Sequence, residues 1–420
     1  EAKGMDIKMK IQIPAPAQEI LEKLNEHGYE AYIVGGCVRD MLLGREPGDW
    51  DITTSALPGQ VKQVFGRTVD TGIQHGTVTV LMGKEGYEVT TYRIDGEYGD
   101  GRHPDSVSFT PSLIEDLKRR DFTINAMAYN QNQGIVDVFG GREDLKQGII
   151  RCVGNPMDRF REDALRILRA LRFSAQLDFD IEEETLKAVS VIAPNLVHVS
   201  KERIQVELTK LLLSGCPERM ELVYKTGISP YVSEAFHQAG ANGVPWLPIS
   251  VPAVKHMRWA AFLRKASPAQ AVKVLRDLKL DNDTIYRVKM LTDWVKRPAG
   301  GADKAAIRRT MSQMEPVLFD DLLVLKKCLA EEDACRGDIP ETGPELLELE
   351  KLSGEIRADG DCISLKTLAV TGNDIIKAGV KPGKKVGETL AMLLGLVLEK
   401  PERNNRQWLL EQAEAACKKD

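Results

Sequence analysis

Two aspartates, Asp49 and Asp51, stand one residue apart, directly before the β-branched run at residues 52–54. β-Branched residues favour strands, and residues two apart on a strand point to the same face, so the two carboxylates should converge. Neighbouring carboxylates repel each other, and a bound cation stabilises both as anions. Oxygen ligands of this kind suit Mg²⁺, which commonly binds one or two carboxylates together with the oxygens of a substrate phosphate. An isolated Asp-x-Asp is more often a solvated strand end, so the metal-site hypothesis depends on the residues around it.

A glycine-rich turn stands just upstream of the aspartates, within residues 34–44. The segment predicts a strand that runs into a Gly-Gly turn and then a short helix that carries Arg39. Glycine lets backbone N–H groups approach a phosphate closely, which makes Gly36 a candidate ligand, and a helix N-terminus favours an anion. Arg39 adds a planar cation that matches phosphate oxygens. Gly-Gly turns alone are usually only turns, but beside the aspartate pair this one predicts a nucleoside triphosphate site.

The predicted secondary structure that must position these residues changes near residue 150, from mixed strands and helices to helices alone. Before that point short β-like runs alternate with turns, and two helical stretches, 16–27 and 113–119, interrupt them. This pattern predicts an α+β domain built on one sheet. After about residue 155 apolar residues recur at helical spacing, so the remainder should be all-α. The expected strands cover residues 31–34, 51–54, 76–81, 87–92 and 134–139.

Composition narrows the class of protein further. The chain has 420 residues, of which 43% are hydrophobic and 28% charged, as is ordinary for a globular protein of several domains. A net charge of −5 argues against a protein that binds nucleic acid over most of its surface, but it allows a local basic groove. No apolar stretch is long enough to span a bilayer, and the polar start shows no signal peptide, with Met5 as the expected native start. Seven scattered cysteines without Cys-x-x-Cys spacing suggest reduced thiols, so we expect a cytoplasmic protein without a membrane partner.

Five motifs follow one another between residues 34 and 173, and their order is more specific than any one of them. The combination Gly-Gly-x-Val-Arg-Asp followed by Gly-Asp-x-Asp resembles the nucleotidyltransferase superfamily that includes DNA polymerase beta. Within that superfamily the chain resembles the bacterial class II tRNA nucleotidyltransferases, the CCA-adding enzymes. The motifs lie at residues 34–44, 48–54, 119–127, 137–141 and 161–173.

The resemblance implies a fold class, a division of the chain and an activity. The expected fold is α+β, with a polymerase-beta-like nucleotidyltransferase sheet domain followed by all-α neck, body and tail. The expected parts are a catalytic head (5–150), a nucleotide-selecting neck (151–215), a body (216–300) and a tRNA-binding tail (301–420). The implied activity is template-independent addition of CCA to the 3′ end of tRNA from CTP and ATP. Mg²⁺ is the implied cofactor, tRNA is the implied partner, and pyrophosphate is released.

The motif at 161–173 can select a base by its hydrogen-bonding edge. On one helix, Asp163, Arg166 and Arg169 would share a broad face with Glu162, opposite a leucine- and isoleucine-rich face. Cytosine and adenine each present an amino donor beside a ring-nitrogen acceptor, so Asp163 can accept from the first while Arg166 donates to the second. Uracil and guanine present the opposite order and would leave both side chains unpaired. The pair can therefore admit CTP and ATP, although in isolation it would be an ordinary surface salt bridge.

The resemblance also assigns roles to residues whose function spacing alone does not determine. It makes Arg169 and Arg172 nucleotide ligands, although helical rotation puts Arg172 toward the apolar side, where it could be a buried structural cation. Arg120 resembles a phosphate ligand. The neighbouring Asp121 and Asn125 lie near the ribose by resemblance or brace the site, since such residues often cap turns.

A segment dense in glycine and charge, residues 93–104, predicts a mobile loop. By resemblance it lets these enzymes switch from C to A addition, and its full length disfavours a CC-only enzyme. An A-adding enzyme and a bacterial poly(A) polymerase are the related alternatives, although the latter usually carries a strongly basic C-terminal extension. A catalytically idle RNA-binding protein and a phosphate hydrolase are the alternatives from other classes. The intact metal, phosphate and base-selecting residues disfavour both.

Overall fold

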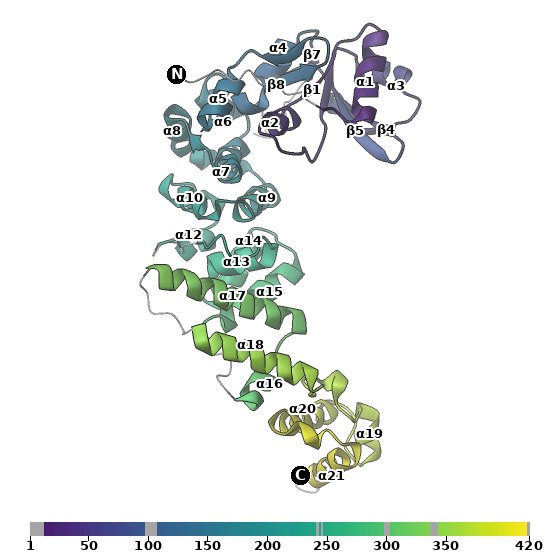
Figure 1. Ribbon diagram of the computed structural model, residues 1–420, viewed down its shortest axis with the longest axis vertical. Helices are drawn as coiled ribbons and strands as arrows, with labels where there is room; N and C mark the ends of the chain where they lie inside the picture. Colours follow the sequence, from purple (N-terminus) through teal and green to yellow (C-terminus); the bar gives the residue numbers. More distant parts are fainter. Residues whose placement is uncertain are drawn as a thin grey trace. The chain divides into compact units, whose positions relative to one another are not determined.

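The computed structural model describes residues 12–96, 107–240, 243–244, 247–297, 303–336 and 343–417 (Figure 1). The chain forms two compact units, Glu1–Gln238 and Ala239–Asp420. Their boundary lies inside the segment 216–300 that the sequence assigns to a helical body, so the four-part division stays a proposal. The mobile loop expected at residues 93–104 lies mostly outside the described residues.

A seven-stranded mixed sheet forms the base of the first unit, as expected for an α+β domain (Figure 1). Neighbouring strands are antiparallel except β2 and β5, which pair in parallel. In spatial order the strands are β3 (Thr68–Gly72), β4 (Thr77–Met82), β5 (Glu85–Thr91), β2 (Ile52–Thr54), β1 (Ala31–Val34), β8 (Met127–Asn130) and β9 (Gly134–Asp137). Two smaller sheets pair β6 (Arg93–Asp95) with β7 (Val107–Phe109), and β10 (Ile149–Ile150) with β11 (Asp180–Ile181).

The five strands expected from the sequence are all present, within two residues of the expected bounds. The sequence does not predict β8, because the methionine, alanine and asparagine in that strand carry little β preference. Strand β8 nevertheless lies between β1 and β9, which makes β1 an interior strand. All four residues of β1 are buried, as expected for a strand covered on both faces. The Gly-Gly turn that follows β1 therefore starts from a rigid point of the sheet.

Helix α1 (Ala15–Glu26) shows how the sequence builds the layer that covers the sheet. Its buried residues recur at helical spacing, so one face is apolar and contacts β1 and β2. Each fully buried leucine or isoleucine of this kind contributes about 1.5–3 kcal/mol to folding. The buried residues are Ala17, Ile20, Leu21 and Leu24. The other helices of the sheet region are α2 (Gly36–Leu42), α3 (Pro58–Val64), α4 (Leu113–Lys118) and α5 (Gly141–Gln147).

After the sheet the chain is almost entirely helical, as the apolar periodicity predicts. Helix α7 (Leu165–Leu177) packs against α9 (Lys201–Leu212), and α6 (Pro156–Glu162) packs against α8 (Glu183–Ile192). The remaining helices of this stretch are α10 (Glu221–Lys225), α11 (Ser229–Val232) and α12 (Glu234–Gly240), which reaches the boundary between the units.

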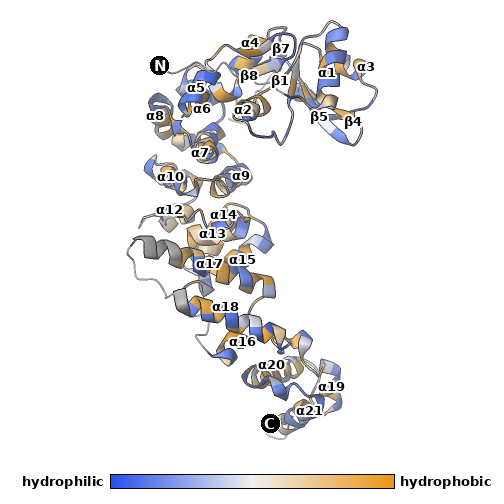
Figure 2. Ribbon diagram, in the orientation of Figure 1, coloured by the Kyte–Doolittle hydropathy of each residue, from blue (hydrophilic) through white to orange (hydrophobic). Residues whose placement is uncertain are grey.

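In its described residues the second unit contains helices and no strand. One hydrophobic cluster joins α19, α20 and α21 through Ile375, Leu393, Val397 and Leu409, each fully buried. Hydrophilic and hydrophobic residues alternate along the helices (Figure 2), and no helix in the described part of the chain is long and apolar enough to cross a membrane. The helices are α13 (Lys255–Leu263), α14 (Pro268–Asp277), α15 (Asn282–Trp294), α16 (Lys304–Ser312), α17 (Pro316–Arg336), α18 (Gly343–Ala358), α19 (Gly372–Lys377), α20 (Lys384–Glu399) and α21 (Arg406–Cys417).

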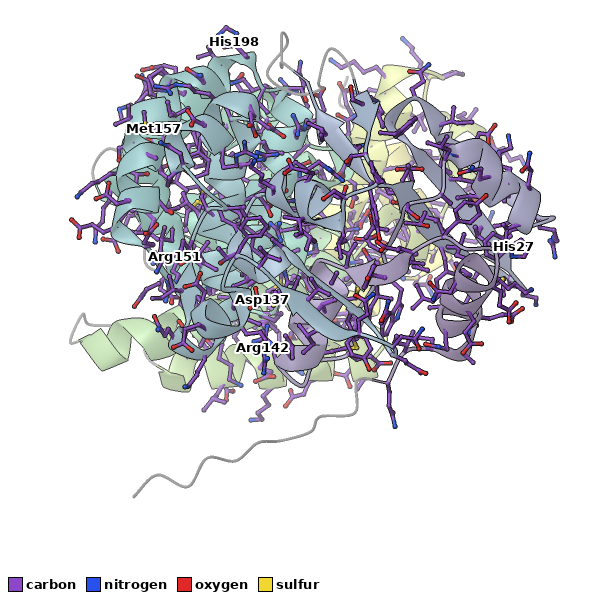
Figure 3. All side chains as sticks on the ribbon, turned by 90° about the horizontal axis from the view of Figure 1, so that it is seen from above. His27, Asp137, Arg142, Arg151, Met157 and His198 are labelled. Atoms are coloured by element: carbon purple, nitrogen blue, oxygen red, sulfur yellow. The ribbon has the colours of Figure 1, made fainter. Side chains whose placement is uncertain are left out.

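The motif at residues 137–141 closes the end of the sheet against α5. The Asp137 carboxylate accepts hydrogen bonds from the backbone N–H groups of Gly141 (2.8 Å) and Arg142 (2.9 Å), the first residues of that helix. Figure 3 labels Asp137 and Arg142, which lie close together. These bonds satisfy two of the N–H groups that a helix leaves open at its start. Gly141 itself lies against the backbone of Thr123, so a Cβ there would overlap the Thr123 carbonyl oxygen and lie 2.9 Å from its carbonyl carbon.

Replacement of Gly141 by alanine should therefore destabilise the fold without touching the aspartate pair. Because the obstacle is backbone, which cannot turn aside, we expect the free energy of unfolding to fall by about 1–3 kcal/mol. Chemical denaturation followed by circular dichroism measures the change. Gly59→Ala is the matched control, since Gly59 lies in α3 with nothing within 4 Å of its Cβ position. An alanine there should leave stability unchanged or raise it slightly; equal effects of the two variants would contradict the packing argument.

Candidate active site

Asp49 and Asp51 line one cavity of about 670 Å³, so the two carboxylates come together as the sequence predicts. They lie in the extended segment that leads into β2 and not within the strand itself. The Asp51 carbonyl accepts a hydrogen bond from the Val34 N–H (3.0 Å), which extends the pairing between β2 and β1 up to this residue. The cavity is lined by Pro14, Gly48, Asp49, Trp50, Asp51, Glu85, Gly86, Tyr87 and Glu88.

Negative charge accumulates around Asp51. Solvent reaches this side chain, yet the surrounding protein crowds it and raises its pKa by desolvation. The charges of Glu88 and Asp49 raise the pKa of Asp51 further, while the Arg120 guanidinium opposes them. A cation would relieve this repulsion, and carboxylate oxygens are the ligands that hard divalent cations prefer. The residues present therefore fit such an ion, although the described residues contain no group of three or more His, Cys, Asp or Glu placed to hold one.

The Gly-Gly turn adopts a backbone conformation that requires glycine at its first position. Gly35 has φ of +81° and is the N-cap residue before α2, and a Cβ there would lie 3.0 Å from Nη1 of Arg120. Arg39 on α2 is buried; it donates to Asp40 through Nε (2.9 Å) and to Asn125 through Nη1 (2.7 Å). Gly36 and Arg39 are not among the described residues that line the aspartate cavity. Arg120 is the link between the turn and the aspartates, because it lies against the turn and interacts electrostatically with Asp51.

Arg120 contacts a buried aspartate, Asp116, that the sequence did not indicate as part of the site. Asp116 is fully buried and accepts hydrogen bonds from the Nε of Arg119 (3.0 Å) and from Thr53 on β2 (3.2 Å). Its second oxygen lies 3.5 Å from Nη2 of Arg120. Burial alone would raise the pKa of Asp116, but the charges of Arg119 and Arg120 hold it below its ordinary value. The helical position of Asp116, one turn before Arg120, is the only sequence signal for this contact.

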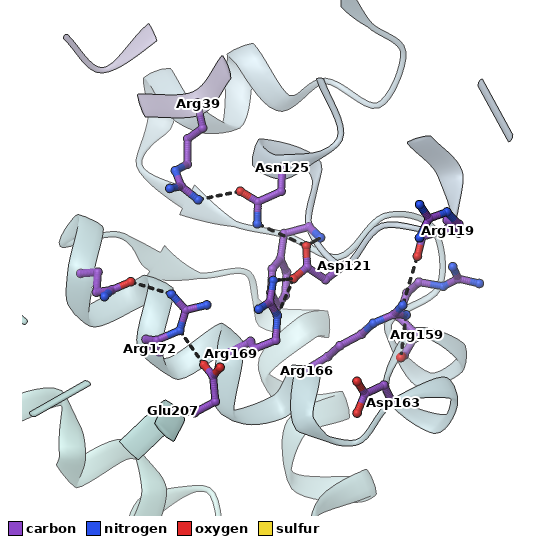
Figure 4. A network of polar contacts seen from close by, with 12 residues as sticks. Arg39, Arg119, Asp121, Asn125, Arg159, Asp163, Arg166, Arg169, Arg172 and Glu207 are labelled. Carbon is purple, nitrogen blue, oxygen red and sulfur yellow. Dashed lines mark hydrogen bonds and ion pairs between the residues drawn. The ribbon is translucent and has the colours of Figure 1, made fainter. Parts of the chain in front are cut away.

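A second buried carboxylate, Asp121, joins the sheet region to helix α7 (Figure 4). Its Oδ2 accepts from Nε (2.8 Å) and Nη2 (2.6 Å) of Arg169, and its Oδ1 accepts from Asn125 (3.2 Å). Burial alone would raise the pKa of Asp121, but the charges of Arg169 and Arg166 and the hydrogen bonds from Arg169 and Asn125 hold it well below its ordinary range. Since Asn125 also accepts from Arg39, one continuous network runs from α2 to α7. Asp121 and Asn125 thus brace the site, one of the two roles that the sequence left open.

The selecting motif does not form the single helix that the sequence predicts. The chain leaves helical geometry at Asp163 (φ −140°, ψ 104°), between α6 and α7. The expectation that Asp163, Arg166 and Arg169 share one helix face with Glu162 is therefore wrong. The apolar face of the motif is confirmed, because four of its residues are buried: Leu165, Ile167, Leu168 and Leu171.

The two candidate base-selecting residues are also not paired with each other. Asp163 accepts from Nη2 of Arg203 on α9 (2.7 Å), and its other oxygen accepts the Leu165 N–H (3.0 Å). Arg166 donates to Glu162 (2.6 Å). It also donates to the backbone carbonyls of Arg119 and Arg159 (3.1 Å each), as Figure 4 shows. The i, i+3 salt bridge that would be the structural interpretation of this pair does not form. Both side chains are partly exposed and held by separate partners.

Arg172 occupies the position that helical rotation indicated, on the buried side of α7. Its Nε donates to Glu207 of α9 (2.5 Å), its Nη1 donates to Gln176 (2.7 Å), and its guanidinium lies 3.9 Å from the centre of the Phe173 ring. The side chains of Arg172 and Glu207 are only 8% and 7% exposed. In this structure Arg172 is thus a buried, paired cation, and its assignment as a nucleotide ligand rests on resemblance alone.

Comparison with known proteins finds similarity over nearly the whole chain. Three family models match: the poly A polymerase head domain (residues 31–151), the probable RNA and SrmB-binding site of polymerase A (178–239) and tRNA nucleotidyltransferase domain 2 (254–413). The CCA-adding enzyme of Geobacillus thermodenitrificans is 40% identical over 409 residues, covering 94% of this chain and 96% of the relative. That of Limosilactobacillus fermentum is 39% identical over 413 residues, covering 96% and 98%.

A solved structure shows the same similarity in three dimensions. The crystal structure of the Bacillus stearothermophilus CCA-adding enzyme in complex with CTP matches with a TM-score of 0.76 and 34% sequence identity. The match covers 97% of this chain and 100% of that protein.

Asp121→Asn should weaken the fold in a way that depends on pH. At neutral pH the change removes a buried charge partner of Arg169, and we expect the free energy of unfolding to fall by about 2 kcal/mol. Because the folded pKa of Asp121 is depressed, its contribution is present above the unfolded pKa of about 3.9 and is lost as the pH falls through the folded pKa. The difference between variant and wild type should therefore shrink below about pH 4.

Denaturant titrations at pH 7 and at low pH measure this difference. Asp178→Asn is the control, because Asp178 forms an ion pair with Arg219 (2.8 Å) while remaining 73% exposed. Exposed pairs contribute little, so this variant should change stability by less than about 1 kcal/mol. A loss for Asp121→Asn that stayed constant with pH would contradict the electrostatic explanation.

Proposed function

The chain belongs to the family of CCA-adding enzymes, and we propose that it builds the CCA end at the cavity that Asp49 and Asp51 line. Enzymes of this family are tRNA nucleotidyltransferases, which add C, C and A to the 3′ end of tRNA from CTP and ATP and release pyrophosphate. One observation supports the proposed site above the others. Both carboxylates line the same cavity, and the Arg120 guanidinium acts on Asp51 from beside the glycine turn.

We propose Mg²⁺ as the divalent ion on which the family generally depends. The carboxylate oxygens of Asp49 and Asp51 would hold it, and their mutual repulsion is the feature of this chain that favours a cation there. When bound, the ion supplies charge to activate the 3′-hydroxyl of tRNA and to offset the charge that develops at the α-phosphorus. Glu88 lies in the same cavity and remains either a third carboxylate or an ordinary strand residue.

The triphosphate is proposed to lie between this cavity and the glycine turn. Arg120 is the best-supported phosphate ligand, because its Nε is buried without a hydrogen-bond partner among the described residues. Such a donor costs stability unless a ligand uses it. Gly36 and Arg39 are the further candidates. The described contacts of Arg39 with Asp40 and Asn125 use three of its five N–H groups, so two are left for an anion.

Base selection is proposed to rest on Asp163 and Arg166. Asp163 would accept from the amino group of cytosine or adenine while Arg166 donates to the adjacent ring nitrogen. The helix break at Asp163 supports this role, because it turns the carboxylate out of the regular helix without pairing it to Arg166. Arg169, bound to Asp121 and 33% exposed, would contribute from the same side of α7.

The division of labour along the chain is part of the proposal. We assign catalysis to residues 5–150, nucleotide selection to 151–215, and tRNA binding to the helices of 301–420, with a connecting body at 216–300. The family models separate the chain near residues 151 and 239, which supports the first boundary of this scheme.

The activity is tested by supplying two tRNA substrates with CTP, ATP or both. A tRNA that lacks CCA should gain all three nucleotides only when both CTP and ATP are present, and a tRNA ending in CC should gain A alone. Gel separation of labelled tRNA reads the number of additions. A on the second substrate only would make the protein an A-adding enzyme, long A tails would make it a poly(A) polymerase, and no incorporation would favour an RNA-binding protein.

Single alanine replacements of Asp49 and Asp51 should abolish addition and leave the fold intact. Loss of a metal-holding carboxylate removes several kcal/mol of transition-state stabilisation, so the rate should fall by at least about a thousandfold. The free energy of unfolding should stay constant or rise, because the two carboxylates repel each other in the absence of a ligand. Single-turnover addition at saturating Mg²⁺ and thermal unfolding measure the two quantities.

Asp70→Ala is the control, since Asp70 pairs with Lys62 on the surface of the same unit. It should change neither the rate nor the stability by much. Full activity in either Asp49→Ala or Asp51→Ala would remove these residues from the catalytic centre.

A further inference from the structure

Asp163 lies at a point of the chain where the backbone alone does not hold it. It is the single extended residue between α6 and α7, so neither helix determines the direction of its side chain. A carboxylate that must read the amino group of a base has to face it with a defined oxygen. Some other contact must therefore orient Asp163.

The contact comes from helix α9, which the sequence analysis did not connect with nucleotide selection. Nη2 of Arg203 donates to Oδ2 of Asp163 at 2.7 Å, and the side chains are 23% and 14% exposed. The Leu165 N–H binds Oδ1 of Asp163 at 3.0 Å. One donor from the backbone and one from Arg203 thus engage both oxygens and prevent the carboxylate from rotating.

Arg203 also carries a donor that the fold does not use. Its Nη1 is buried and has no hydrogen-bond partner in the part of the chain that the structure describes. A buried, unpaired donor lowers the stability of the folded protein. A residue whose only role was to hold two helices together would not need to carry such a donor. Arg166, the other selecting residue, is held independently through Glu162 and the Arg119 carbonyl.

We propose that Arg203 is a positioning residue for base selection, acting through Asp163. With Arg203 in place, Asp163 presents its oxygens as acceptors in a fixed direction and favours the amino groups of cytosine and adenine over the carbonyls of uracil and guanine. Without it, the carboxylate can swing away, and the discrimination falls while the chemistry at Asp49 and Asp51 continues. The inference rests on the proposed role of Asp163.

The test is the ratio of kcat/KM for CTP over UTP, and for ATP over GTP, in wild type and variants. Arg203→Ala should lower both ratios by about tenfold, the effect of one well-placed hydrogen bond to a charged group. Arg203→Lys, which keeps the charge, should restore part of the selectivity. Arg203→Gln serves as a second measurement should the alanine variant fail to fold.

Arg219→Ala is the matched control on the same unit. Arg219 pairs with Asp178 at 2.8 Å and is 21% exposed, against 2.7 Å and 23% for Arg203. It touches no residue assigned to the nucleotide site, so its loss should lower the melting temperature without changing either ratio. A change of selectivity in Arg219→Ala as large as that in Arg203→Ala would show a general structural effect and overturn the proposal.

A double-mutant cycle with Asp163→Ala separates action through Asp163 from an independent effect. If Arg203 acts through Asp163, adding Arg203→Ala to Asp163→Ala should leave the selectivity ratios unchanged. Ratios in Arg203→Ala that equal those of wild type, or a further fall in the double variant, would overturn the proposal. A wild-type enzyme that shows no preference for CTP and ATP would instead contradict the proposed function itself.

Discussion

The ion pair between Asp121 and Arg169 joins the sheet to the helix that carries the selecting residues, and the site depends on it. Through Asn125 the same carboxylate also reaches Arg39 on α2, so the glycine turn, the segment after α4 and helix α7 share one buried network. Two charges taken out of water are stable there only because each has several partners. The network therefore fixes the glycine turn and helix α7, the two regions proposed to bind the triphosphate and the base, relative to each other.

The aspartate pair differs from the ion pair of Asp121 and Arg169, because it brings like charges together. Asp49 and Asp51 lie together with Glu88 in one cavity, and desolvation together with the charges of Glu88 and Asp49 raises the pKa of Asp51. A folded protein without ligands gains nothing from this arrangement. In the proposed reaction a cation and a triphosphate would bring the complementary charges. Stability is supplied elsewhere, by buried pairs such as Arg172 with Glu207 and by the apolar face of α7.

Much of this could be predicted from the sequence, and most of what was missed at the site depends on contacts between residues far apart in the chain. The aspartate spacing, the Gly-Gly turn and the alternating runs are local signals, and they correctly gave five of the seven strands of the main sheet and the grouping of Asp49 with Asp51 at one cavity. The break at Asp163 has a local signal that the prediction of a single helix overlooked, because aspartate is common at a helix start and its Oδ1 accepts the Leu165 N–H. The second contact of Asp163, with Arg203, has no local signal, because Arg203 lies 40 residues farther along the chain. Asp116 was missed for the same reason, since its partners Thr53 and Arg93 come together only in the folded sheet.

The ion pairs of Asp163 with Arg203 and of Arg166 with Glu162 also constrain which substitutions the proposed base-selecting site can accept. A protein that reads bases with Asp163 and Arg166 could in principle invert its preference by exchanging the two charges. In this chain the exchange would place arginine against Arg203 and aspartate against Glu162, so like charges would meet at both positions. An exchange of the two charges would therefore also require changes at Arg203 and Glu162, four substitutions in all. The partners that hold Asp163 and Arg166 thus disfavour a single charge-reversing substitution at either position.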